Sequence, residues 1–294
     1  MRMAFLANIL RGVFMGSADV VPGVSGGTIA VLLGIYERLI AAISLAAKAC
    51  GNLLRLDLRS AAARLRAVEW GLVLPLVIGI AVAIFTLARV ITRLLDDYPE
   101  AMAGVFTGLV ASSAWVAWRM IRSPDATAAV TTALVGIAAF LLLGISGGAV
   151  TDPSALVIFG AGAIAICAMI LPGVSGSFLL LMLGMYDVVI TAVDERDVFV
   201  LGVFALGAVV GLALFSQVLD WALSRHHDIV LAAMVGLMIG SLRVLWPWPG
   251  GVEDTGLGAP TGTWWIPVIL GVIAALVVVG LTRMFEWRVR AAAG

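Results

Sequence analysis

The sequence has little charge and few of the side chains that metal centres and nucleophilic enzymes use. Charged residues make up 12% of its 294 positions, and it has two cysteines, two histidines and a single lysine, Lys48. A soluble domain carries about 25% charged residues, so a single soluble core is excluded. Cys50 and Cys167 lack metal-ligand spacing, and a formal net charge of zero gives no electrostatic basis for a nucleic-acid partner. The sequence predicts no metal, cofactor or nucleic acid.

Long apolar segments dominate the chain instead. Hydrophobic residues make up 62% of the sequence, and the mean hydropathy is +1.13. A helix needs roughly 20 apolar residues to cross a bilayer. The stretches that meet this requirement are 71–95, 101–121, 126–146, 198–221, 229–247 and 264–285. We therefore predict an all-α integral membrane protein.

Two further apolar stretches, 4–40 and 155–190, are interrupted near the middle by a Pro-Gly pair. Proline removes a helix donor and glycine costs about 1 kcal/mol in a helix interior, so each stretch should be a helix, a break and a second helix. The arms, of about 13–18 residues, are marginal for a full crossing. We interpret both stretches as re-entrant hairpins, with two tight full crossings as the alternative. Either structure crosses an even number of times and leaves the sidedness of later loops unchanged.

The charge of the loops predicts the orientation. Loop 41–69 carries Lys48 and four arginines, loop 96–100 is acidic, and basic and non-basic loops alternate along the rest of the chain. The positive-inside rule then places both termini in the cytoplasm of a multi-pass plasma-membrane protein. Residues 51–68, with leucines among arginines, favour an amphipathic helix on the cytoplasmic surface. A solvated loop is the alternative.

An internal repeat divides the chain into residues 1–146 and 147–294. The pentapeptide Pro-Gly-Val-Ser-Gly at 22–26 recurs at 172–176, Gly79 matches Gly207, and Gly108 matches Gly236. Each half is one hairpin followed by three crossings. Because three is odd, the second half should insert upside down relative to the first. Inverted repeats with broken helices are typical of secondary transporters, with the substrate site where the breaks meet.

The composition of the breaks favours an anion. A helix that restarts after a break exposes N–H groups, glycine lets the backbone approach a ligand, and hydroxyl groups add donors. The alternative is that these small residues only allow close helix packing and cap the broken ends. The predicted substrate-binding residues of the breaks are Ser25, Gly26, Gly27, Thr28, Ser175, Gly176 and Ser177.

Ionisable residues within apolar segments are costly and usually functional. Asp19 precedes the first break, and its counterpart in the second half is Met169. We interpret Asp19 as a proton site or as the partner of an arginine. Glu37 and Asp187 follow their breaks by one helix arm and are further candidates for ion coupling. An arginine can bind a phosphate with two hydrogen bonds, and the candidates for this contact are Arg11 and Arg243; the alternative for an arginine near a helix end is snorkelling to the interface.

The first motif, Asp-Val-Val-Pro-Gly-Val-Ser-Gly-Gly-Thr at 19–28 followed by Gly-Ile-Tyr-Glu at 34–37, resembles the signature of the bacterial polyprenyl-phosphate transporters. The second motif, at 171–178 and 184–186, resembles that family's second motif. The resemblance implies transport of undecaprenyl phosphate, or a related polyprenyl phosphate, from the outer to the cytoplasmic leaflet of the bacterial plasma membrane. This step would recycle the lipid carrier of envelope glycan synthesis, with protons or another ion as possible partners.

Three other functions are compatible with parts of the sequence. An ion-coupled carrier of a small organic anion would use the same hairpins around an enclosed aqueous cavity. A membrane-embedded lipid phosphatase needs a nucleophile or base, but His226 and His227 share one short loop, which we expect to be a solvated turn. A structural assembly protein would leave the paired breaks and the buried charges unexplained. We therefore expect a transporter and not an enzyme.

Overall fold

The computed structural model describes residues 2–21, 24–145, 148, 150–249, 256–260 and 262–293, without the side chains of 2–4 and 285–293. Within these residues the protein is entirely helical and has no strand, which confirms the predicted all-α class. The helices are α1 (Arg2–Asp19), α2 (Gly26–Leu32), α3 (Tyr36–Leu54), α4 (Leu58–Ala67), α5 (Trp70–Asp97), α6 (Pro99–Arg119), α7 (Ala126–Leu142), α8 (Ala155–Ile170), α9 (Gly176–Met182), α10 (Tyr186–Asp194), α11 (Val198–Arg225), α12 (His227–Ser241) and α13 (Trp265–Ala293).

Among the described residues, four helices are long and apolar enough to cross a membrane: α5, α6, α11 and α13. They coincide with four of the six predicted crossings. The other two, 126–146 and 229–247, contain shorter apolar helices, α7 with 17 residues and α12 with 15. A helix rises about 1.5 Å per residue, so both fall short of the roughly 30 Å hydrocarbon core. Helix α12 ends early because the following turns lead into Pro247 and Pro249, which cannot donate helix hydrogen bonds.

The stretches 4–40 and 155–190 are each broken twice, and not once as predicted. Pro22 and Gly23 lie outside the described residues, but α1 ends at Asp19 and α2 begins at Gly26. After the seven residues of α2, the chain turns again at Gly34, whose φ is 65°. The second half repeats this turn at Gly184, with φ 66°, and α9 and α10 are bent by 110° relative to each other. A side chain disfavours such left-handed backbone, which is why glycine stands at both turns.

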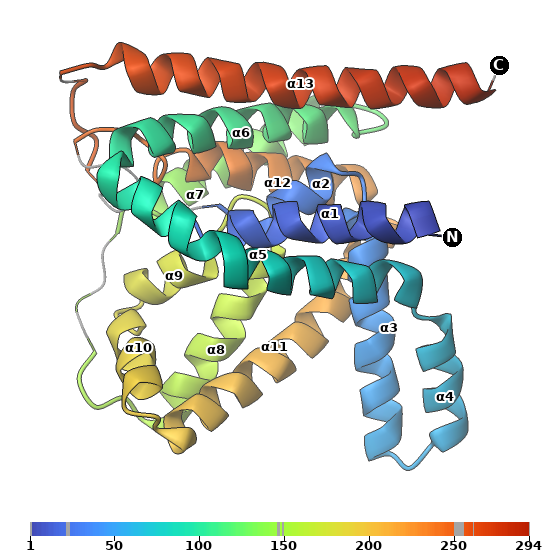
Figure 1. Ribbon diagram of the computed structural model, residues 1–294. Helices are drawn as coiled ribbons and strands as arrows, with labels where there is room; N and C mark the ends of the chain where they lie inside the picture. The colour runs from blue at the N-terminus through green and yellow to red at the C-terminus, as the bar shows by residue number, and fades with distance from the viewer. Residues whose placement is uncertain are drawn as a thin grey trace.

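Residues 41–69, predicted as a loop with an amphipathic helix, are mostly helical. Helix α3 continues to Leu54, and α4 follows as its antiparallel partner (Figure 1). The pair extends away from the other helices at the end of the molecule where both chain termini lie. The connection between the two helices is exposed, with Leu54 and Leu56 88% and 85% exposed beside Arg55 and Asp57. The predicted amphipathic segment therefore corresponds to the end of α3, this turn and α4.

Helix contacts follow the same order in the two halves. Helix α1 packs on α5 as α8 packs on α11, and α6 packs on α13 as α12 packs on α7 (Figure 1). Glycines allow close backbone approach in each pair: a Cβ on Gly16 would lie 2.8 Å from the backbone of Ile80, and one on Gly211 would lie 2.7 Å from the backbone of Ala163. The largest buried apolar cluster joins α2 and α3 to α6 and α12, and includes Val31, Val110 and Met238. These contacts bring the two breaks together inside the protein.

Candidate functional site

Among the described residues, three hydrogen bonds connect residues 25–36 of the first half to the second break. Ser25 donates its hydroxyl to the carbonyl oxygen of Met169 at 2.8 Å, and the amide of Gly173 donates to the Thr28 hydroxyl at 2.8 Å. Tyr36, the first residue of α3, donates its hydroxyl to the carbonyl oxygen of Ile170 at 3.1 Å. These carbonyls belong to the end of α8, where the second break leaves them without helix partners. Each break therefore supplies hydrogen-bonding groups to the other.

A small cavity of about 90 Å³ lies between the breaks. A cavity of about 10–15 Å³ already holds one water molecule, so this one has room for a phosphate-sized group. Both halves contribute to its wall, and four of the predicted binding residues take part. The lining residues are Asp19, Val24, Ser25, Met169, Val174, Ser175, Gly176 and Ser177.

On the first-break side, the donors at the start of α2 are already used by the chain itself. The Gly26 amide donates to Asp19 Oδ1 at 2.6 Å, and the Gly27 amide donates to the Ser25 hydroxyl at 3.0 Å. The expectation that the N–H groups of this break are free for an anion is therefore wrong. Of the two roles predicted for Asp19, a proton site or the partner of an arginine, the second is not seen among the described residues: the partner of Asp19 is a backbone amide. A carboxylate already occupies the position that an anionic ligand would take.

On the second-break side, a methionine takes the place of this carboxylate. A Cβ added to Gly26 would lie 2.7 Å from Asp19 Oδ2, and one added to Gly176 would lie 2.5 Å from Met169 Cγ, so the two side chains occupy corresponding positions. Among the described residues, no hydrogen bond uses the amides of Gly176 and Ser177. The hydroxyls of Ser175 and Ser177 lie 2.9 Å apart. The second break therefore leaves amide and hydroxyl donors beside the cavity.

The other predicted binding residues do not line the cavity. Gly27 and Thr28 are buried in the contact between the breaks. Arg11 donates to Asn8 Oδ1 at 2.8 Å, two turns before Asp19 on α1. The guanidinium carbon of Arg243 lies 4.8 Å from the centre of the Phe140 ring, and its buried Nε has no hydrogen-bond partner in the described structure.

The acidic candidates Glu37 and Asp187 also lie away from the cavity, each in the first turn of the helix after the second bend. Glu37 contacts His227, with 2.9 Å between Oε1 and Nε2. His227 was expected in a solvated turn, but it is the first residue of α12 and its side chain is only 14% exposed. Local sequence carries no signal for this contact, because its partners lie 190 residues apart. The same holds for Asp220, which accepts hydrogen bonds from Ser44 at 2.9 Å and Lys48 at 3.3 Å.

Comparison with known proteins identifies the family. A sequence model of the undecaprenyl phosphate translocase-like family matches residues 15–256, which include both breaks and the cavity. The chain belongs to this family. It is 38% identical over 247 residues to the polyprenyl-phosphate transporter of Vibrio cholerae, covering 84% of this chain and 79% of that protein. It is 29% identical over 299 residues to the polyprenyl-phosphate transporter of Staphylococcus aureus, covering 94% and 96%.

Family membership, together with four described helices that are long and apolar enough to cross a membrane, makes the chain a multi-pass membrane protein of a transporter family, and not an enzyme. The resemblance noted in the two motifs is thereby confirmed. No solved structure matches the fold.

Proposed function

We propose that the chain transports undecaprenyl phosphate, or a related polyprenyl phosphate, from the outer to the cytoplasmic leaflet of the bacterial plasma membrane. This transport returns the lipid carrier to envelope glycan synthesis. The names of the two relatives support a polyprenyl phosphate substrate. The observation that carries the proposal for this chain is the cavity between the breaks, whose second-break side has unpaired amides and two hydroxyls.

The phosphate binds on the second-break side in this proposal. Gly176 and Ser177 supply amides, and Ser175 and Ser177 supply hydroxyls. Hydrogen bonds to a charged group contribute about 1.5–3 kcal/mol each, so a few of them suffice to select a phosphate. The cavity is too small for the prenyl chain, which stays among the exposed apolar side chains that face the membrane.

Asp19 is the group in this site that would bind a proton together with the phosphate. Its carboxyl group lines the same small cavity, and two anions that share one site disfavour each other's charged form. Phosphate entry therefore favours a protonated Asp19: Oδ1 keeps the Gly26 hydrogen bond, and the proton resides on Oδ2. Release of the phosphate restores the carboxylate and releases the proton to water. Proton and lipid phosphate then move in the same direction.

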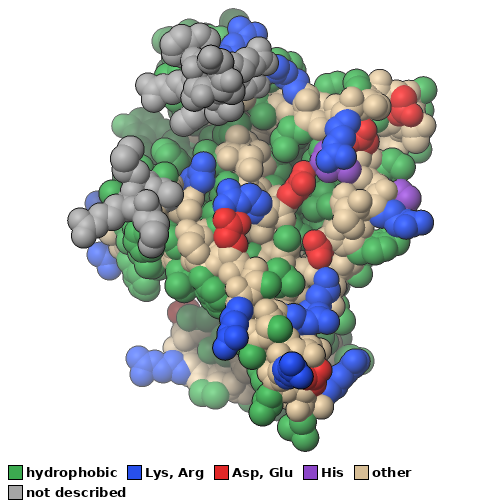
Figure 2. All heavy atoms as spheres, turned by 90° about the vertical axis from the view of Figure 1, so that its right-hand side faces the viewer, with side chains coloured by type: hydrophobic (Ala, Val, Ile, Leu, Met, Phe, Trp, Pro, Cys, Tyr) green, Lys and Arg blue, Asp and Glu red, His purple; other side chains and the backbone are tan. Residues whose placement is uncertain are grey.

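The transport cycle uses the two halves as inverted repeats. The corresponding contacts of α1 with α5 and α8 with α11, and of α6 with α13 and α12 with α7, support this arrangement. Figure 2 looks onto the end of the molecule that carries α3 and α4, and Lys and Arg side chains are distributed over it. By the positive-inside rule we assign this end, with both termini, to the cytoplasm.

A leaflet-resolved assay in proteoliposomes tests the proposal. We expect the purified chain to move polyprenyl phosphate between leaflets, and the double variant Ser175→Ala/Ser177→Ala to lose most of this activity. Thr86→Ala, which removes an exposed hydroxyl on α5, serves as the control and should transport normally. Wild-type transport by the double variant would refute the assignment of the phosphate to the second break. Absence of lipid movement by the wild-type chain would refute the function itself.

A further inference from the structure

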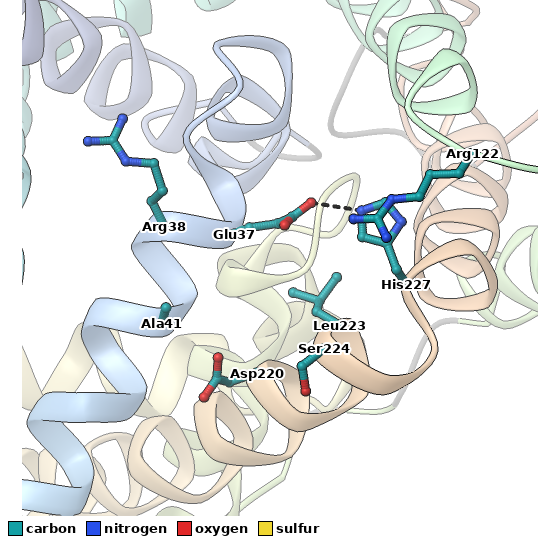
Figure 3. Close-up of a pocket in the computed structure, with 8 residues that line it drawn as sticks. All are labelled: Glu37, Arg38, Ala41, Arg122, Asp220, Leu223, Ser224 and His227. Atoms are coloured by element: carbon teal, nitrogen blue, oxygen red, sulfur yellow. Dashed lines mark hydrogen bonds and ion pairs between the residues drawn. The ribbon is translucent and has the colours of Figure 1, made fainter.

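A second, larger pocket of about 330 Å³ lies away from the cavity, between the starts of α3 and α12, the end of α11 and the residues after α6 (Figure 3). The start of α3 connects the two regions, because Tyr36 contacts the second break while the next residue, Glu37, lines the pocket. Glu37 reaches across the pocket toward His227. In the proposed orientation this pocket opens toward the cytoplasm. The lining residues are Glu37, Arg38, Ala41, Arg122, Asp220, Leu223, Ser224 and His227.

Both ring nitrogens of His227 face carboxylate oxygens. Nε2 lies 2.9 Å from Glu37 Oε1, and Nδ1 lies 2.9 Å from Asp228 Oδ1. An ionised carboxylate only accepts hydrogen bonds, and a neutral imidazole has a single N–H group to donate. If the ring is neutral and both carboxylates are ionised, one ring nitrogen donates a hydrogen bond to its carboxylate. The other ring nitrogen has no hydrogen and faces a carboxylate oxygen, so two acceptors lie against each other. Both contacts are hydrogen bonds when this group of three side chains holds one additional proton.

The proton is shared between Glu37 and His227, because other contacts keep Asp228 as an acceptor. Asp228 Oδ1 accepts the amide of Arg122 at 3.1 Å, and Oδ2 accepts the amide of Ser123 at 3.0 Å. A protonated Asp228 would weaken both hydrogen bonds. Asp228 thus fixes the ring of His227 on α12, while Glu37 on α3 is the partner that can separate.

The charged groups around this contact are largely paired with one another. Arg38 hydrogen-bonds to Glu69 through Nε at 3.0 Å, and Asp220 binds Ser44 and Lys48. Arg122, three residues after the end of α6, extends toward His227 (Figure 3). The charged groups that line the pocket around this contact are Glu37, Arg38, Arg122 and Asp220, and Asp228 contacts the other nitrogen of the ring. Lys48 lies behind Asp220, and Arg225 and His226 line a separate pocket with Trp221.

We infer that Glu37 and His227 form a proton-binding latch that closes this pocket. With the proton bound, α3 and α12 are held together. When the proton leaves to cytoplasmic water, Glu37 and the neutral ring lose their charge-assisted hydrogen bond and the pocket opens. The latch itself does not depend on the proposed function. Only the role of the pocket, as the exit of the lipid phosphate to the cytoplasmic leaflet, rests on that function. Cytoplasmic pH would then control release.

Within the described residues, the second half has no equivalent of the latch. Asp187 is the counterpart of Glu37, and the spacing that matches Gly79 with Gly207 places Pro99 where His227 would stand. In the described part of the chain, Asp187 forms no ion pair. Asp187→Asn is therefore a matched control for Glu37→Gln, because each removes one acid from the same position of a repeat.

Thiol labelling of the pocket tests the latch without any transport measurement. In a chain lacking Cys50 and Cys167, Ala41→Cys places a thiol in the pocket wall and Ala62→Cys places one on the exposed face of α4. The ratio of the two labelling rates removes the intrinsic pH dependence of the thiol. We expect this ratio to be several-fold higher in an alkaline buffer, in which the shared proton is lost, than in an acidic buffer, in which it is bound.

In Glu37→Gln the ratio should be independent of pH, because the amide can donate or accept and the contact no longer needs the extra proton. Asp187→Asn should keep the wild-type pH response. The inference would be overturned if the labelling ratio in Glu37→Gln changed with pH as it does in the chain that retains Glu37, or if the ratio in the chain that retains Glu37 did not change with pH. Neither result depends on lipid transport, so failure of the latch is distinguishable from failure of the proposed function.

Discussion

The two breaks share a pentapeptide but differ in one side chain that faces the helix start. At the first break, Asp19 accepts the Gly26 amide at 2.6 Å. At the second break, Met169 stands in the corresponding place beside Gly176, whose amide has no partner among the described residues. The first break thus carries its own anion, while the second has donors for one from outside. Because only the first break has an acid, the two breaks form one site in the proposed mechanism: the first-break wall binds the proton and the second-break wall binds the phosphate.

A substitution that gives the second break the acid of the first should have the largest effect on lipid-phosphate affinity. Met169→Asp would place a carboxylate beside Gly176, where it would take the amide and repel the phosphate. Two charges about 4 Å apart interact by about 4 kcal/mol at a protein surface, so we expect a loss of about a hundred- to a thousandfold in lipid-phosphate affinity. Met169→Leu, which conserves volume, should bind nearly as wild type. Equal affinities in a binding titration of the two variants would break the comparison.

Substitution of the two capping serines, Ser25 and Ser175, should have different effects: one should lower stability and the other should weaken lipid-phosphate binding. Ser175→Ala should weaken binding by about ten- to a hundredfold, the value of one hydrogen bond to a charged group. Ser25→Ala should mainly lower the free energy of unfolding, by about 0.5–2 kcal/mol, because its hydroxyl caps α2 and binds Met169. Thermal unfolding and binding titrations on both variants measure the split. If Ser25→Ala weakens binding as much as Ser175→Ala without loss of stability, the two walls are equivalent.

Asp19→Asn should abolish proton binding during transport and leave the structure unchanged. The amide oxygen can still accept from Gly26, but it cannot take up a proton. Wild-type affinity should rise as the pH falls, because protonated Asp19 no longer repels the phosphate. The variant should lack this part of the pH response and lose transport driven by a pH gradient. An unchanged pH profile would exclude Asp19 as the proton site.

The two tyrosines that begin α3 and α10 should show the smallest difference. The Tyr36 hydroxyl donates to Ile170 at the second break, and its side chain is 3% exposed, whereas Tyr186 is 37% exposed. Tyr36→Phe should cost about 0.5–1.5 kcal/mol in the free energy of unfolding, and Tyr186→Phe should cost less. The same loss in both variants, measured by chemical unfolding in detergent, would argue against a specific contact between the breaks.

Local sequence was sufficient to predict the all-α class, four of the six long crossings and the first break of each half. Proline and glycine within an apolar run act on their own neighbours, so their effect can be predicted without the fold. The second bends at Gly34 and Gly184 were missed, although the Gly-x-Tyr pattern repeated around them. They depend on a left-handed glycine that sequence alone does not distinguish from a packing glycine.

Partners across the fold were less predictable. Asp19 was predicted to be a proton site or the partner of an arginine. Its partner in the structure is a backbone amide of α2, which costs less than a second buried charge. The contact of Glu37 with His227 joins residues 190 positions apart, for which composition and spacing contain no information. The cavity residues Ser25, Ser175, Gly176 and Ser177 were predicted because the repeat itself marks them.

Solid-state NMR of the chain in liposomes tests the central claim most directly, through distances from the lipid phosphorus to labelled backbone nitrogens. With ¹⁵N-serine labelling and a polyprenyl phosphate, the account predicts that the phosphorus lies within hydrogen-bonding range of the Ser177 amide, with the assignment confirmed by loss of the signal in Ser177→Ala. The Ser25 amide, on the acid-bearing wall, should be farther away. A phosphorus closest to Ser25, or close to neither serine, would contradict the assignment of the phosphate to the second break.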